Sequence, residues 1–259
     1  MTRLQYGVIG GSVLLLLLLY LGCETTPPAQ KRVERSRAAT AQTTDINVLR
    51  AEAKESLNAN ALGNIQALEQ RLSQAATDSL RIEALRELSR SWYQTGHPAL
   101  AGYYAEELAN ISGTEEAWSI TGTTFAICVQ RATTDKVKAY CNEQAIRAFE
   151  NAISLNPAEV AHRVNLAFTY TEMPPAGEPM KGVMMLRELQ EAYPNSTLVL
   201  NSLARLAIQT GQWERATERL QQALAIEPDN QNTICLLAQA YAGLGDQAQA
   251  AAFAERCDR

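Results

Sequence analysis

The chain has 259 residues, of which 46% are hydrophobic, 20% are charged and 6% are aromatic. This apolar fraction is large enough to build a packed core, so the composition excludes a chain that is disordered throughout. Of its 23 basic and 28 acidic residues, five basic and two acidic ones lie in residues 1–43, so the remainder has 18 basic and 26 acidic residues, a net charge of −8. Such a surface repels phosphates, and we expect no nucleic-acid partner.

Residues 1–23 form a predicted export segment. Arg3 precedes an uncharged apolar stretch from Gly7 to Gly22, which is the pattern of a signal peptide. This stretch is shorter than the roughly 20 apolar residues that a membrane-spanning helix needs.

The end of this segment resembles a lipobox, the motif of bacterial lipoproteins in which a cysteine after a small residue is lipidated and becomes the new N-terminus. Gly22 and Cys23 match the motif, whereas Tyr20 and Leu21 stand where it has leucine and a small residue. The resemblance implies lipid attachment at Cys23. The alternative is an uncleaved signal anchor, because the stretch from Leu4 to Leu21 spans a bilayer if its ends snorkel.

Residues 24–44 are rich in threonine, proline, alanine and charge, and they show no apolar period. This composition predicts a flexible linker. Under both anchor hypotheses, the rest of the chain is tethered to a membrane by this linker.

The organising feature after the linker is a repeat of 34 residues. Pro194 and Pro228 are 34 residues apart, and the clearest copy covers residues 197–230. Ala204 and Ala216 are small enough for two helices to cross closely, Gly211 ends the first helix, and Pro228 stops the second. Apolar residues at spacings of three and four place one face of each helix in a core. They are Leu200, Leu203, Ala204, Ala207, Ala216, Leu220, Ala223 and Ile226.

Four further segments, residues 82–113, 115–158, 160–196 and 231–259, carry the same pattern. The copy at 115–158 has about eleven extra residues, which predict two longer helices around a turn near Thr133. Residues 45–81 read as an N-terminal helical hairpin without the repeat signature, as expected of a cap.

These spaced residues resemble the tetratricopeptide repeat family over residues 82–259, of the exported bacterial lipoprotein type. The resemblance implies an all-α fold, a right-handed α-solenoid of antiparallel helix pairs. It also implies a protein or peptide partner, bound on the concave wall that the first helices form.

The sequence contains no recognisable catalytic or metal-binding pattern. His97 in a turn and His162 early in a helix have no Cys, Asp or Glu at metal-ligand spacing. We interpret His97 as a polar turn residue and His162 as a helix-surface residue. The pair Glu115–Glu116 reads as a solvated helix face. We therefore predict a protein that is not an enzyme and has no metal, no cofactor and no small-molecule substrate.

Four cysteines remain if Cys23 is lipidated. Cys128 and Cys141 flank the predicted turn near residue 133, and Cys235 and Cys257 lie on opposite helices of the last copy. Each pair is level on antiparallel helices, so both pairs are candidate disulfides in an oxidising compartment. The alternative is free thiols, with Cys257 in place of a core alanine and Cys235 lining the groove.

The resemblance also implies which side chains line the groove. They are Arg86, Arg90, Tyr93, Ser119, Thr123, Val164, Phe168, Asn201 and Arg205. Arg86 and Arg90 match two places of the family's clamp for chaperone C-termini, but Ile120 stands where that clamp has asparagine, so we reject this partner. The arginines favour an acidic or carboxylate-bearing peptide, unless they pair with neighbouring glutamates.

The sequence thus predicts a membrane-anchored interaction scaffold in the bacterial cell envelope, with its repeats in the periplasm. One alternative is an accessory subunit of a secretion, outer-membrane-assembly or cytochrome-maturation complex. Another is a self-associating structural lipoprotein, since the last copy ends in an uncapped helix face.

Overall fold

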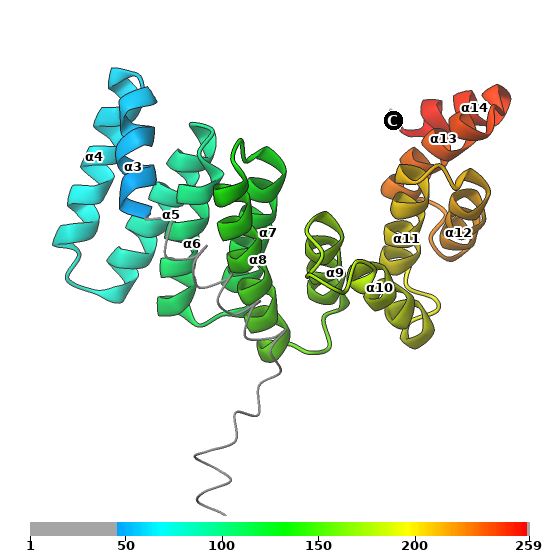
Figure 1. The fold of residues 1–259 in the computed structure, drawn as a ribbon, viewed down its shortest axis with the longest axis horizontal. Coiled ribbons are helices and arrows are strands. Elements are labelled where there is room, and N and C mark those ends of the chain that lie inside the picture. The colour runs from blue at the N-terminus through cyan, green and yellow to red at the C-terminus, as the bar shows by residue number, and fades with distance from the viewer. Residues whose placement is uncertain (1–45, 258–259) are drawn as a thin grey trace, which may run out of the picture. The chain divides into compact units, whose positions relative to one another are not determined.

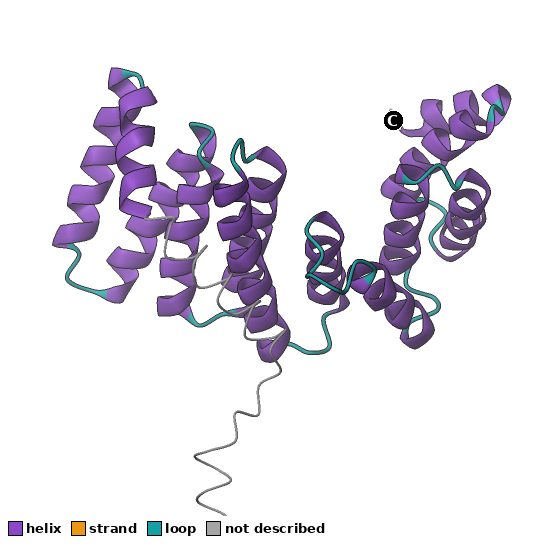
Figure 2. Cartoon of the chain, viewed as in Figure 1, coloured by secondary structure: helices purple, strands orange, loops and turns teal. Residues whose placement is uncertain are grey.

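The computed structural model describes residues 46–257, and these residues form twelve α-helices and no strand (Figure 1, Figure 2). The predicted export segment with Cys23 and the linker at 24–44 lie outside the described residues. Within residues 46–257, no helix combines the length and the apolar character that crossing a bilayer requires. The helices are α3 (Ile46–Ser56), α4 (Ala59–Gln74), α5 (Asp78–Gln94), α6 (Pro98–Ser112), α7 (Glu115–Arg131), α8 (Asp135–Leu155), α9 (Val160–Glu172), α10 (Lys181–Ala192), α11 (Thr197–Gln209), α12 (Trp213–Ile226), α13 (Gln231–Leu244) and α14 (Gln247–Cys257).

Short polar residues begin many of these helices, and glycines end two of them. The side chains of Thr114, Ser196 and Asn230 each accept a hydrogen bond from the backbone amide three residues later. Such a cap satisfies an amide that has no partner inside the helix and stabilises the helix by about 1 kcal/mol. Gly113 and Gly245 end α6 and α13 with φ of 62° and 82°, a conformation that glycine adopts without strain.

The helices pair as successive hairpins, α5 with α6, α7 with α8, α9 with α10, α11 with α12 and α13 with α14 (Figure 1). First helices also contact one another across the repeats, α7 with α9, α9 with α11 and α11 with α13. The predicted all-α solenoid of helix pairs is confirmed. The first hairpin begins at Asp78, a turn before the predicted residue 82.

Small residues let the helices approach closely. Ala204 and Ala216 are fully buried in the core that α11, α12 and α13 share. On Gly122, an added Cβ would lie 2.6 Å from the ring of Phe149, which is less than any real side-chain contact. The buried Phe149 ring therefore packs directly on the backbone of α7, and only glycine fits there.

Helices α3 and α4 precede the first hairpin, and there α4 contacts α5 while α3 contacts α6. From α4, only Ile65 and Leu68 are buried, while Lys54 of α3 forms a 2.6 Å ion pair with Glu69 of α4. The outer side of α4 exposes asparagine and glutamine. A polar outer helix keeps the end of a solenoid from pairing with another copy.

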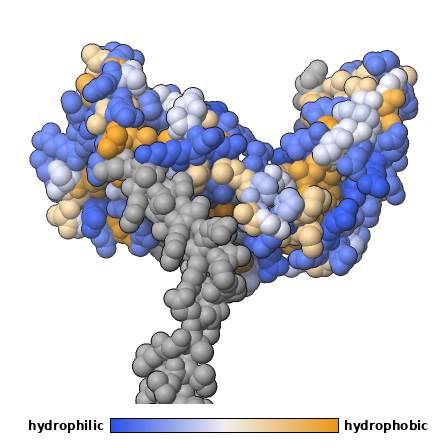
Figure 3. Space-filling view, in the orientation of Figure 1, coloured by the Kyte–Doolittle hydropathy of each residue, from blue (hydrophilic) through white to orange (hydrophobic). Residues whose placement is uncertain are grey.

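On the face shown in Figure 3, hydrophilic side chains cover much of the surface and separate small groups of apolar ones.

Candidate functional site

The first helices of three consecutive repeats, α7, α9 and α11, line a cavity of about 270 Å³, and one residue of α8 forms part of its wall. Its lining residues are Thr123, Ala126, Ile127, Val129, Gln130, Phe149, Asn165, Phe168, Thr169, Glu172, Arg205 and Gln209. Since the first helices form the concave wall of a solenoid, this cavity lies where such a fold binds a partner.

Each first helix contributes two lining residues that are four positions, about one helical turn, apart. They are Thr123 and Ile127 on α7, Phe168 and Glu172 on α9, and Arg205 and Gln209 on α11. Most of the apolar lining comes from α7 and α8, with Phe168 from α9, whereas α11 contributes only Arg205 and Gln209, which are charged or form hydrogen bonds.

Arg205 of α11 and Phe168 of α9 are in contact inside this groove. The guanidinium carbon of Arg205 lies 5.2 Å from the centre of the Phe168 ring, over its face. Such a cation–π contact contributes about 0.5–1 kcal/mol at an exposed site. No carboxylate of residues 46–257 forms an ion pair with Arg205, so the charge stays available to a ligand.

The predicted groove residues of α5 lie outside this cavity. Arg86 is exposed, and Arg90 forms a 3.6 Å ion pair with Glu87 on its own helix. The exposed ring of Tyr93 contacts the guanidinium of Arg131, whose Cζ lies 5.7 Å from the ring centre. The structure therefore does not bring the three predicted arginines together at one site.

Two predicted groove residues are wrong. Val164 and Asn201 are each only 2% exposed. Val164 packs in the core shared by α9, α10 and α11, and the Asn201 amide donates a 2.9 Å hydrogen bond to the hydroxyl of Thr233 on α13. These two side chains point toward the first helix of the following repeat and not into the groove, so they hold neighbouring repeats together. Ser119 is half-buried.

Several cavity residues were missed from the sequence. Ile127, Glu172 and Gln209 lie about one turn after predicted positions, and Asn165 lies one residue after Val164. The signal for the first three was present, because residues four apart share a helix face. To find them, the predicted groove face of each first helix has to be extended by one more turn toward the C-terminal end of the helix.

A three-residue hydrogen-bond network joins the repeats on either side of the loop between α8 and α9. His162 Nε2 lies 2.5 Å from Oε1 of Glu115, and Asn156 donates to Oε2 of the same carboxylate at 2.9 Å. The interpretation of His162 as a surface residue is wrong, because α9 packs on α7 and leaves His162 4% exposed. The hydrogen bond from Asn156 is the largest cause that lowers the pKa of Glu115, and the hydrogen bond with His162 is the second. Glu115 is therefore not simply part of a solvated helix face, because it links two repeats.

Cys128 of α7 and Cys141 of α8 form a disulfide in the long hairpin, with their Cα atoms 5.9 Å apart. The turn between these helices covers residues 132–134, around the predicted Thr133. Both sulfurs belong to the buried core of the hairpin.

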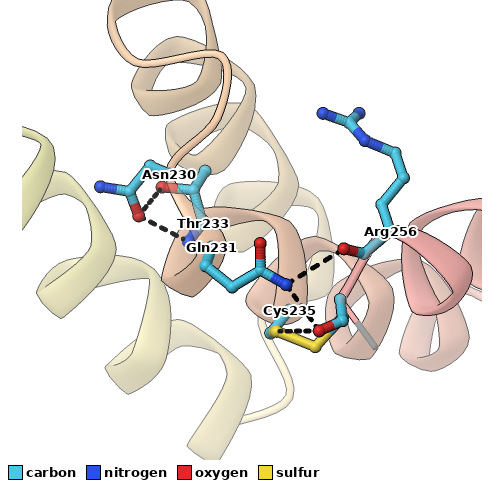
Figure 4. The surroundings of a disulfide bond; sticks show 6 residues. Asn230, Gln231, Thr233, Cys235 and Arg256 are labelled. Atoms are coloured by element: carbon cyan, nitrogen blue, oxygen red, sulfur yellow. Dashed lines mark hydrogen bonds between the residues drawn. A yellow bond between two sulfur atoms is a disulfide. The ribbon is translucent and has the colours of Figure 1, made fainter. Parts of the chain in front are cut away.

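Cys235 of α13 and Cys257 of α14 form a second disulfide, shown in Figure 4. Beside it, the side-chain amide of Gln231 donates to the backbone oxygens of Arg256 at 3.0 Å and Cys257 at 2.5 Å. Both cysteines are half-buried. The end of α14 is thus held to the first turns of α13 by one covalent bond and two hydrogen bonds.

The described residues bring together no group of three His, Cys, Asp or Glu side chains suited to a metal ion. A larger space, about 480 Å³, lies among α3, α4, α5 and α6, but three of its four charged side chains, those of Arg50, Lys54 and Glu69, already have partners. Lys54 binds Glu69 at 2.6 Å, and Arg50 donates to the hydroxyl of Tyr104 at 3.1 Å. The groove of α7, α9 and α11 is therefore the better candidate site.

Residues 207–257 match the family model described as the tetratricopeptide repeat. The fold is similar to that of TTC0263, a thermophilic TPR protein of Thermus thermophilus, with 19% sequence identity, a TM-score of 0.50, and coverage of 70% of this chain and 88% of that chain. A structure of MamA, from residue 41 to its end, from Desulfovibrio magneticus RS-1 shows 16% identity, a TM-score of 0.42, and coverage of 68% and 92%. No curated protein matches the chain.

Proposed function

We propose that this chain, a solenoid with the tetratricopeptide repeat fold, is a scaffold that binds an extended segment of a partner protein in the groove of α7, α9 and α11. The observation that carries the proposal is the cavity of about 270 Å³ that side chains from three consecutive repeats line together. A groove that crosses several repeats suits a long, narrow ligand, because each repeat contacts one part of it.

The side chains of the groove also suit a peptide. Asn165, Gln130 and Gln209 offer amide groups that both donate and accept hydrogen bonds, as a peptide backbone does. Ile127 and Phe168 offer apolar surface for a side chain. Apolar walls with a few polar groups give both affinity and orientation.

We also propose that the scaffold is anchored to a membrane of the bacterial cell envelope, with its repeats in the periplasm. The pattern of residues 1–23 supports export, and Cys23 is the candidate for lipid attachment. Two disulfides within the repeats support an oxidising compartment, since such bonds are rare in the cytosol of most organisms.

Site-specific photo-crosslinking in the native host tests the groove. A photoreactive amino acid replaces Gln130, which lines the cavity, or Gln66, which is exposed on α4. We expect a partner protein to crosslink at position 130 and not at position 66. Equal crosslinking at both positions, or none at position 130, would contradict the proposal, and crosslinked dimers of the chain would favour self-association.

Fatty-acid labelling tests the anchor. We expect the wild-type chain to incorporate labelled palmitate and to sediment with membranes, and the Cys23→Ser variant to lose the label. A wild-type chain that carries no label but still sediments with membranes would favour the signal anchor. A wild-type chain found only in the soluble fraction would rule out both anchors.

A further inference from the structure

We infer that the groove selects a partner segment in which a large apolar side chain and a carboxylate lie within about three residues of each other. The apolar side chain enters the cavity between α7 and α9, and the carboxylate binds Arg205 of α11. This specificity rests on the proposed function of the groove and names the chemistry of the ligand. The spacing follows from the 5.2 Å between the guanidinium carbon of Arg205 and the centre of the Phe168 ring, which belongs to the apolar lining.

The apolar end of the cavity comes from three helices. Ala126, Ile127 and Val129 belong to α7, Phe149 to α8, and Phe168 to α9. The volume of about 270 Å³ corresponds to roughly nine water molecules at about 30 Å³ each. Water held against such a wall has few partners, so a large aliphatic or aromatic side chain gains free energy by displacing it.

The cationic end consists of Arg205, and its contacts differ from those of two arginines outside the cavity. Arg90 is paired with Glu87, and Arg147 with Glu106 at 2.5 Å. Arg205 instead rests over an aromatic ring, and no carboxylate of the described chain forms an ion pair with it. The ring contact holds the guanidinium in place before a ligand arrives, which reduces the entropic cost of binding. The planar guanidinium then offers two parallel N–H donors to a carboxylate.

Glu172 restricts the ligand further. It lines the same cavity one turn after Phe168 and is exposed, and it forms no ion pair with Arg205. A second carboxylate on the ligand would meet this negative charge, whereas a backbone N–H or a lysine would be attracted. We therefore expect a segment with a single acidic residue beside the apolar one, and not an acidic tract.

Selection from a random library tests the specificity. Phage that display random 12-residue peptides are panned on the full chain in detergent micelles, and selected sequences are synthesised for affinity measurements. We expect enrichment of Asp or Glu within three residues of Phe, Tyr, Trp, Leu or Ile. Arg205→Glu should weaken these peptides at least about tenfold, and replacing their acidic residue by lysine should restore binding to that variant.

Arg86→Glu is the matched control, since Arg86 is also exposed on a first helix but lies outside the cavity. It makes the same change in net charge and should leave the affinities unchanged. Equal unfolding midpoints for both variants would show that neither substitution perturbs the fold.

The outcomes separate the two proposals. Peptides that bind at the cavity with no acidic bias, or that bind Arg205→Glu as tightly as the wild type, would overturn the specificity and leave the scaffold function standing. A library from which no peptide binds the wild-type chain would overturn both.

Discussion

The α7–α8 and α13–α14 hairpins are both closed by a disulfide, but they occupy different places in the stack. The central hairpin contacts α6 on one side and α9 on the other, and Cys128 and Cys141 are 1% and 0% exposed. The terminal hairpin contacts α11 and α12, no described element follows α14, and α14 buries only Ala250. Because repeats contact mainly their neighbours, a disulfide adds to extensive packing in the central hairpin and substitutes for missing packing in the terminal one.

Removing one aromatic side chain from each hairpin should give the largest difference. Phe149 is buried in the central hairpin, and Phe149→Ala should lower the free energy of unfolding by about 3–5 kcal/mol, because it leaves a cavity that helices on both sides prevent from closing. Phe253 is half-buried and stacks on Tyr241, so Phe253→Ala should cost about 1–2 kcal/mol. Urea titrations of both variants measure the two values, and equal losses would contradict the comparison.

The two disulfides should differ in their response to a reductant. We expect dithiothreitol to reduce Cys235–Cys257 in the folded protein, because these cysteines are half-buried, whereas the buried Cys128–Cys141 bond should need unfolding. Alkylation with a maleimide, followed by mass spectrometry of peptides, identifies the bond that opens first.

Hydrogen exchange then shows what each bond holds. After mild reduction, the amides of α14 should lose protection while those of α8 keep it, because α14 has few buried contacts of its own. Central thiols that react before the terminal ones, or an α14 that stays fully protected, would show that terminal packing is stronger than the burial indicates.

Two hydrogen-bonded carboxylates, one in each region, should make the stability of the protein depend on pH. Glu115 binds Asn156 and His162 in the centre, and Glu227 accepts hydrogen bonds from Thr197 and Asn230 at 2.6 Å each near the C-terminus. Both pKa values lie below the ordinary 4.5 because of these hydrogen bonds. A lowered folded-state pKa gives stability that is present above about pH 4.5 and is lost as the pH falls through the folded value.

We therefore expect Glu115→Gln and Glu227→Gln to be less stable than the wild type at pH 6 and to approach it at pH 3. Denaturant midpoints at the two pH values measure this change. Glu116→Gln is the control, since Glu116 is exposed and should change neither midpoint. A difference between wild type and Glu115→Gln that stays constant from pH 6 to pH 3 would exclude the linkage.

Exposed ion pairs should have the smallest effect. Arg71 and Glu83 pair at 3.2 Å with more than half of each side chain in solvent. Arg71→Ala should change the free energy of unfolding by less than about 0.5 kcal/mol, because water screens the charges. A loss above about 1 kcal/mol in a urea titration would show that the cap depends on this pair.

The repeat pattern predicted the helical hairpins well because each one is encoded locally. Apolar spacing, cap residues such as Ser196 and breakers such as Pro228 act within a few residues of one another. The groove residues were predicted less well. Phe168, Thr123 and Arg205 line the cavity, but Val164 and Asn201 are buried against neighbouring helices. Which side of a first helix faces the groove depends on how far each hairpin rotates against the next, and no local pattern records that angle.

The sequence by itself determined the all-α fold, the stacking of helix pairs and the excess of acidic residues, since helical periodicity and charge are properties of single segments. Only the tertiary structure decided that Arg205 lies over Phe168 without a carboxylate partner, and that His162 is buried against Glu115. Each of these contacts joins residues more than 30 positions apart in the chain. They form because close packing selects one mutual orientation of the repeats, and that orientation determines which side chains meet.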